Sequence, residues 1–80
     1  MPAFCNQEHL CTLDRLLDVV GPDRAVWIEQ LIKHFPDLTA SQADDIVYYY
    51  LTAYMDAQAA SCANTWSHRY LAGRIALRGF

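Results

Sequence analysis

Apolar residues recur at steps of three and four along most of this chain, which is the spacing of one face of an α-helix. The first such segment extends from about Asn6 to Val20, and Asn6 can cap its start. Gly21 and Pro22 predict its end, because glycine adopts the left-handed C-terminal conformation and proline cannot continue the helix. The apolar stripe of this helix consists of Leu10, Leu13, Leu16, Leu17 and Val20.

Two further helices are predicted before residue 60. One extends from about Asp23 to His34, ahead of Pro36. Its stripe is Ile28, Leu31, Ile32 and Phe35, with Trp27 beside it. The next helix begins at Thr39, because Thr39 and Gln42 have the spacing of a capping box. Its apolar positions fall within about 140° of arc. They are Ala43, Ile46, Val47, Tyr50, Leu51 and Tyr54.

The last helix is predicted over about Thr65 to Leu77. Neither glycine nor proline occurs between Pro36 and Gly73, so the third and fourth helices could form one long bent helix. We expect a break near 61–65 instead, because serine, asparagine and threonine there compete for backbone hydrogen bonds. The sequence therefore predicts a single all-α domain over residues 1–80. We expect a compact four-helix domain, with three helices and a long bent C-terminal helix as the alternative.

This last helix carries apolar side chains on two sides. One stripe consists of Trp66, Tyr70, Gly73 and Leu77. Leu71 and Ile75 lie about 120–165° from the centre of that stripe. A helix that is apolar on two sides is either central in its own bundle or shared with a second molecule. We therefore predict an interface of Leu71, Ile75 and Phe80; the alternative is that the helix ends early and Ile75 folds back into the core.

Gly73 strengthens the expectation of a close helix contact. Glycine in a helix interior costs about 1 kcal/mol relative to alanine, so its presence needs a structural reason. The close approach of another helix is such a reason, and Ala72 and Ala76 add further small residues nearby.

The charges divide the chain into an acidic body and a basic end. All nine acidic residues lie between Glu8 and Asp56, and counting gives −6 for residues 1–60 (three basic, nine acidic) and +3 for residues 61–80. The net charge of −3 disfavours non-specific binding to nucleic acid or to anionic membranes. We expect Arg69, Arg74 and Arg78 to fix the charge register at the interface. A minority form of the hypothesis is an acidic surface that docks on a basic groove. It would be formed by Asp14, Asp18, Asp44, Asp45 and Asp56.

The second and third predicted helices loosely resemble a helix-turn-helix motif in spacing. The exposed positions of the recognition helix would be Asp44, Asp45, Tyr48 and Tyr49. Carboxylates repel phosphates, and the commonest base contacts come from Arg, Lys, Asn or Gln. These positions therefore count against DNA binding, which we keep as the alternative function. Tyr48 and Tyr49 are candidate anchors for a protein partner, although packing against neighbouring helices is the interpretation we favour for them.

Candidate metal and redox chemistry is sparse. Cys5 and His9 could share a helix face near Cys11, but no cysteine pair has the spacing of a structural zinc site. Cys62 and His68, six residues apart, would not share a helix face. We predict no metal and no cofactor, and leave a redox disulfide such as Cys5–Cys62 as a minor alternative. No phosphate-binding loop or catalytic motif occurs, so we expect a protein that is not an enzyme.

The N-terminal residues predict neither a signal peptide nor a membrane span, because they lack a basic start and a long apolar run. An odd number of cysteines favours a reducing cytoplasm. The sequence thus favours a small cytoplasmic protein-binding regulator, adaptor or inhibitor that acts by steric occlusion or bridging. Its partner would be another protein or a second copy of itself. The alternatives are a small helix-turn-helix DNA-binding regulator and a structural subunit of a larger assembly.

Overall fold

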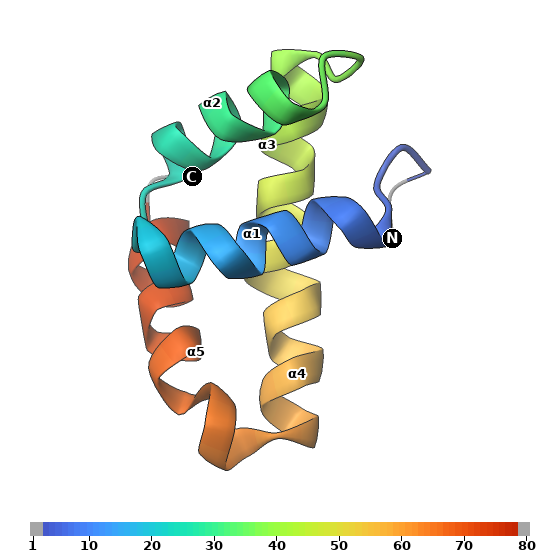
Figure 1. Cartoon of the computed structure of the whole chain (residues 1–80). Coiled ribbons are helices and arrows are strands. Elements are labelled where there is room, and N and C mark those ends of the chain that lie inside the picture. Colours follow the sequence, from blue (N-terminus) through green and yellow to red (C-terminus); the bar gives the residue numbers. More distant parts are fainter. Residues whose placement is uncertain (1–2, 79–80) are drawn as a thin grey trace.

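Residues 3–78 form four helical rods, which confirms the predicted all-α four-helix domain (Figure 1). The computed structural model describes residues 3–78, and the side chains of all of these except residues 63 and 64. The elements are α1 (Gln7–Val19), α2 (Arg24–His34), α3 (Ala40–Tyr49), a π-helical turn η1 (Tyr50–Tyr54), α4 (Met55–Ser61) and α5 (Ala63–Leu77). Because α3, η1 and α4 follow one another directly, they form one continuous rod. Residues 3–78 contain no β-strand.

The rod organises the other helices. In Figure 1, α1 crosses the middle of the rod, α2 lies against its α3 end, and α5 returns alongside its α4 end in the opposite direction. The rod therefore contacts each of the other three helices, and α1 links the α2 side of the molecule to the α5 side.

The predicted helix ends are confirmed by their local hydrogen bonds. Asn6 caps α1, and Asp23 caps α2 by accepting a hydrogen bond from the Val26 amide at 3.2 Å. Gly21 has a φ of 94°, the left-handed conformation expected of a glycine that follows a helix. The capping box at the start of α3 is also present, with distances of 3.1 Å and 3.0 Å for its two reciprocal bonds.

The break between α4 and α5 is confirmed, and it lies at Cys62. Cys62 leaves the helical conformation, with φ −137° and ψ 52°, while its amide still donates to the Gln58 carbonyl at 2.8 Å. Cys62 is the N-cap residue of α5 and makes no side-chain capping hydrogen bond. The helix therefore begins at Ala63, two residues before the predicted start.

The hydrophobic core lies where α1, α2 and the inner face of α5 meet the rod. Its largest fully buried side chains are Trp27, Tyr50, Leu13, Leu31, Ile46, Met55 and Val47. Ile28 and Ile32 of the predicted stripe are half-buried, whereas Trp27, predicted beside that stripe, has a completely buried indole. Its ring N–H donates to the Gly21 carbonyl at 2.9 Å, which satisfies the polar atom and ties α2 to the end of α1. Val20 is exposed, because α1 ends at Val19 and Val20 only caps it.

Candidate protein-binding surface

The inner face of α5 packs against the rod of the same molecule. Trp66, Gly73 and Ala76 are buried there. A Cβ atom added at Gly73 would overlap the sulfur of Met55 and lie 3.5 Å from the Leu51 Cδ2 atom. The predicted close approach at Gly73 is therefore present, and the approaching helix belongs to the chain itself. Gly73 needs no second molecule to explain it.

The outer face of α5 leaves two large aliphatic side chains in solvent. Leu71 is 63% exposed and Ile75 is 58% exposed. The two residues are one turn apart on the same side of the helix. The alternative in which α5 ends early and Ile75 folds back into the core is wrong, because α5 continues to Leu77 and Ile75 faces outward.

Two arginines flank these aliphatic side chains. Arg74 and Arg78 are exposed, and together with Leu71 and Ile75 they fall within about 100° of arc on α5. The guanidinium of Arg74 lies 5.0 Å from the centre of the Tyr70 ring and donates to the Tyr70 hydroxyl at 2.6 Å. This contact holds the Arg74 charge beside the aliphatic pair. We call Leu71, Arg74, Ile75 and Arg78 the outer patch.

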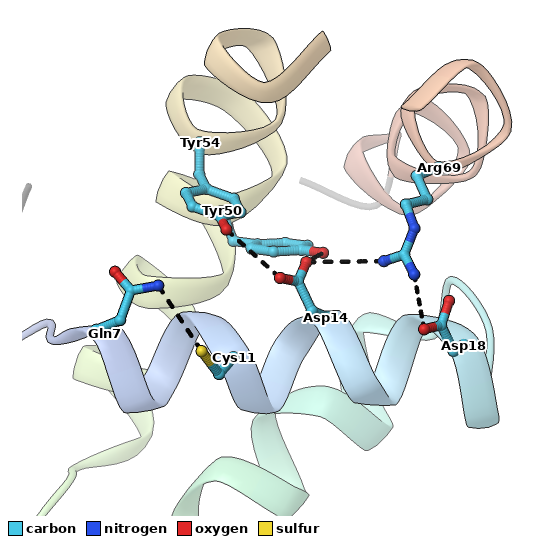
Figure 2. A network of polar contacts seen from close by, with 7 residues as sticks. All are labelled: Gln7, Cys11, Asp14, Asp18, Tyr50, Tyr54 and Arg69. Atoms are coloured by element: carbon cyan, nitrogen blue, oxygen red, sulfur yellow. Dashed lines mark hydrogen bonds and ion pairs between the residues drawn. The ribbon is translucent and has the colours of Figure 1, made fainter. Parts of the chain in front are cut away.

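Arg69, the third predicted interface arginine, points away from the outer patch and toward α1. Its guanidinium donates to the Asp18 carboxylate at 2.7 Å and lies 3.8 Å from the Asp14 carboxylate (Figure 2). It also lies 5.2 Å from the Trp66 ring centre. Burial alone would lower the pKa of Arg69, but the hydrogen bond with Asp18 and the two carboxylate charges raise it. Arg69 thus neutralises part of α1 and fixes α5 against it.

Asp14 is the centre of a polar network that joins α1 to the rod as well as to α5. Its carboxylate accepts hydrogen bonds from the Tyr50 hydroxyl at 2.6 Å and the Tyr54 hydroxyl at 3.4 Å (Figure 2). The two tyrosine rings are stacked, with centroids 5.3 Å apart. Burial raises the pKa of Tyr50, and the hydrogen bond with Asp14 raises it further. Tyr50 therefore stays protonated as a hydrogen-bond donor, and the network serves to connect three helices.

The other residues of the predicted acidic surface and of the tyrosine pair are dispersed. Asp44 lies 4.0 Å from the Arg24 guanidinium, whereas Asp45 and Asp56 are exposed on the rod. Tyr48 is exposed, and Tyr49 is half-buried against the core. Asp14 and Asp18 belong to the network of Arg69, which offsets part of their charge. Phe80, the third predicted apolar contact, lies outside the described residues.

The described residues bring no metal-binding or redox group together. Among residues 3–78, no cluster of three His, Cys, Asp or Glu side chains could hold a metal ion. Cys5, Cys11 and Cys62 are free thiols, and burial raises the pKa of the Cys5 thiol. The disulfide between Cys5 and Cys62 that was considered from the sequence is not formed in this structure. No helix within the described part of the chain is long and apolar enough to cross a membrane.

No protein-family model, curated protein sequence or solved structure matches this chain. The candidate function therefore depends on the chain's own surfaces. Of these, the outer patch of α5 combines exposed aliphatic side chains with a fixed charge.

Proposed function

We propose that this protein is a small non-enzymatic regulator that binds another protein through the outer patch of α5. The observation that carries the proposal is the exposure of Leu71 and Ile75, at 63% and 58%, on adjacent turns of a helix whose opposite face already supplies the core. Single exposed aliphatic residues are common on protein surfaces, whereas a neighbouring pair flanked by arginines matches the composition of binding sites. The protein would act by steric occlusion of its partner or by bridging two partners.

Charge indicates the chemistry of the partner. Arg74 and Arg78 flank the aliphatic pair, and residues 57–80 contain no Asp or Glu. Two copies that paired through their α5 helices would bring arginines toward a helix that offers no carboxylate. A partner segment with apolar residues flanked by Asp or Glu would satisfy both the aliphatic pair and the arginines. We therefore propose an acidic amphipathic helix as the bound segment.

The acidic body makes the alternative of DNA binding the weaker proposal. Asp45 and Tyr48 are exposed on the third helix, where a helix-turn-helix protein would present its base-reading residues. A carboxylate at this position faces DNA phosphates with the wrong charge. A structural subunit that uses the outer patch as an assembly seam differs from a regulator only in its fixed stoichiometry. We propose a cytoplasmic location, which the odd number of cysteines supports.

A photo-crosslinking amino acid at position 71 tests the proposed surface in the cells that make the protein. Position 29 is the matched control, because Glu29 is exposed on α2, away from the outer patch. We expect position 71 alone to crosslink a partner, and we expect mass spectrometry to place the crosslink in a segment rich in apolar and acidic residues. A photoreactive group at position 75 should crosslink the same partner. Leu71→Glu should abolish the crosslink from position 75 without changing the circular dichroism or the thermal midpoint.

Three outcomes would overturn the proposal. Equal crosslinking from positions 71 and 29 would mean that the outer patch is not a specific site. A mass near twice 9.1 kDa by light scattering, returned to 9.1 kDa by Leu71→Glu, would make a second copy the partner. Affinity for random duplex DNA that falls steeply with salt, measured by fluorescence anisotropy, would favour the DNA-binding alternative.

A further inference from the structure

The capping box of α1 contains a buried histidine. The residue His9 is 4% exposed. Its Nδ1 atom accepts a hydrogen bond from the backbone amide of Asn6 at 3.1 Å. In return, the Asn6 side-chain oxygen accepts a hydrogen bond from the His9 amide at 3.1 Å. The His9 ring also meets the Phe35 ring edge to face, with centroids 4.5 Å apart. His9 thus ties the N-terminal segment to both α1 and the end of α2.

A second capping box in the same molecule provides an internal reference. At the start of α3, Gln42 occupies the position that His9 occupies in α1, and its side-chain oxygen accepts from the Thr39 amide at 3.0 Å. Glutamine cannot gain a proton at ordinary pH, so it accepts this bond at every pH. Imidazole accepts at Nδ1 only while that nitrogen is unprotonated. The two boxes therefore have the same geometry and a different dependence on acid.

Protonation of His9 would turn its acceptor into a donor that faces the Asn6 amide, another donor. It would also place a cation in the first turn of α1, where the helix dipole is positive. The surrounding ionisable groups are of both signs. Glu8 on α1 favours the proton. Asp37 in the α2–α3 loop and His34 at the end of α2 line the same groove as His9. The loss of the hydrogen bond from Asn6 and the burial of the ring also oppose the protonation of His9.

We propose that His9 is an acid-sensitive latch, whose protonation breaks the α1 cap and releases the segment Phe4–Asn6 from the ends of α2 and α3. Phe4 and Asn6 of this segment line a surface groove of about 490 Å³. The same groove is lined by Phe35, Asp37 and Gln42. Release of the latch therefore opens this groove and exposes the buried Cys5.

The direction of the pH dependence follows from the environment of His9. Burial lowers the pKa of His9, and the charge of Glu8 raises it by less. The released segment takes up a proton near the ordinary histidine pKa of about 6.5. The closed form does so only at lower pH, so acid favours release. The stabilisation from the latch is complete above the ordinary pKa and is lost as the pH falls toward the lowered value.

Amide hydrogen exchange measured by NMR between pH 7.5 and 5 tests the latch in the intact chain. We expect the protection of the His9 amide, corrected for intrinsic exchange, to fall by up to about tenfold per pH unit between the two pKa values. In His9→Gln, which restores an ordinary capping box, that protection should not change with pH. The Gln42 amide is the matched control, and its protection should be constant in both proteins. His34→Gln should behave as the wild type does.

Each other result would contradict the latch. A fall in protection that is equal in the wild type and in His9→Gln would assign the pH response to another group. Constant protection of the wild-type His9 amide would mean that the cap survives protonation. If His9→Gln failed to fold, NMR titration of the wild-type imidazole would decide the question, because a pKa at or above about 6.5 is incompatible with the proposal.

Discussion

The two faces of α5 are similar in residue type and opposite in role. The inner face places Trp66, Gly73 and Ala76 against the rod, where the absence of a Gly73 side chain makes room for Met55. The outer face presents Leu71 and Ile75 to solvent, and no contact within residues 3–78 buries them. The apolar content of this helix thus exceeds what the core of the molecule uses. Substitutions on the inner face should therefore change stability, and substitutions on the outer face should change binding.

The largest expected effect is on the inner face, at Gly73. Gly73→Leu forces a side chain against Met55, which is fully buried and cannot move into solvent. Because even a Cβ atom overlaps the Met55 sulfur, we place the cost of overpacking at the upper end of its usual range of about 1–3 kcal/mol. Leucine regains about 1 kcal/mol in helix propensity, so we expect a net loss near 2 kcal/mol. Urea denaturation followed by tryptophan fluorescence measures it.

Leu71→Ala is the matched control for Gly73→Leu on the outer face, and we expect it to change the free energy of unfolding by less than about 0.5 kcal/mol. The double variant Gly73→Leu with Met55→Ala should recover part of the lost stability, because truncation of Met55 removes the overlap. An undiminished stability in Gly73→Leu alone would mean that α5 does not approach the rod as closely as the structure shows.

An intermediate effect is expected where α1 connects the rod to the inner side of α5. Asp14→Ala leaves the buried Tyr50 hydroxyl without its acceptor, which should cost about 1–2 kcal/mol. Tyr50→Phe removes the hydroxyl itself and leaves Asp14 with Tyr54 and Arg69, so we expect a loss of about 1 kcal/mol or less. Urea denaturation of both variants at pH 7 shows which of them loses more free energy of unfolding. The reverse order would show that the Asp14 network is not the main connection between α1 and the rod.

Local features of the sequence predicted the helices and their ends. Asn6, Gly21 and the Thr39–Gln42 pair act on backbone groups within a few residues of themselves, so their roles can be read from spacing. The need for a close contact at Gly73 was also predictable, because the penalty for glycine in a helix is local. The identity of the helix that makes this contact could not be predicted, because Met55 is 18 positions away from Gly73 and its approach depends on the turn at Cys62.

Only part of the candidate site could be predicted from the sequence, because spacing reports local geometry and not contacts between distant residues. Helical spacing separates Leu71 and Ile75 from the core face, and the structure places both in solvent. Spacing places Arg69 about 140° from Arg74 around the helix, but it cannot reveal the ion pair of Arg69 with Asp18, which is 51 residues away in the chain. The His9 cap was missed although it had a local signal. Asn6 and His9 have the spacing of Thr39 and Gln42, with histidine where glutamine or glutamate is usual.

The smallest expected effect distinguishes two arginines that look alike in the sequence. Arg69→Gln removes the ion pairs with Asp18 and Asp14, which solvent screens, so we expect a loss of at most about 1 kcal/mol that shrinks as salt is added. Arg74→Gln should leave the free energy of unfolding unchanged and slow association with an acidic partner, because charges at the edge of an interface act mainly on the association rate. Urea denaturation at low and high salt, together with association kinetics on the partner captured at position 71, measures both. If Arg74→Gln lowered stability as much as Arg69→Gln did, Arg74 would contribute to folding as Arg69 does. Arg74 would then have to be assigned to the inner face of α5 and not to the outer patch.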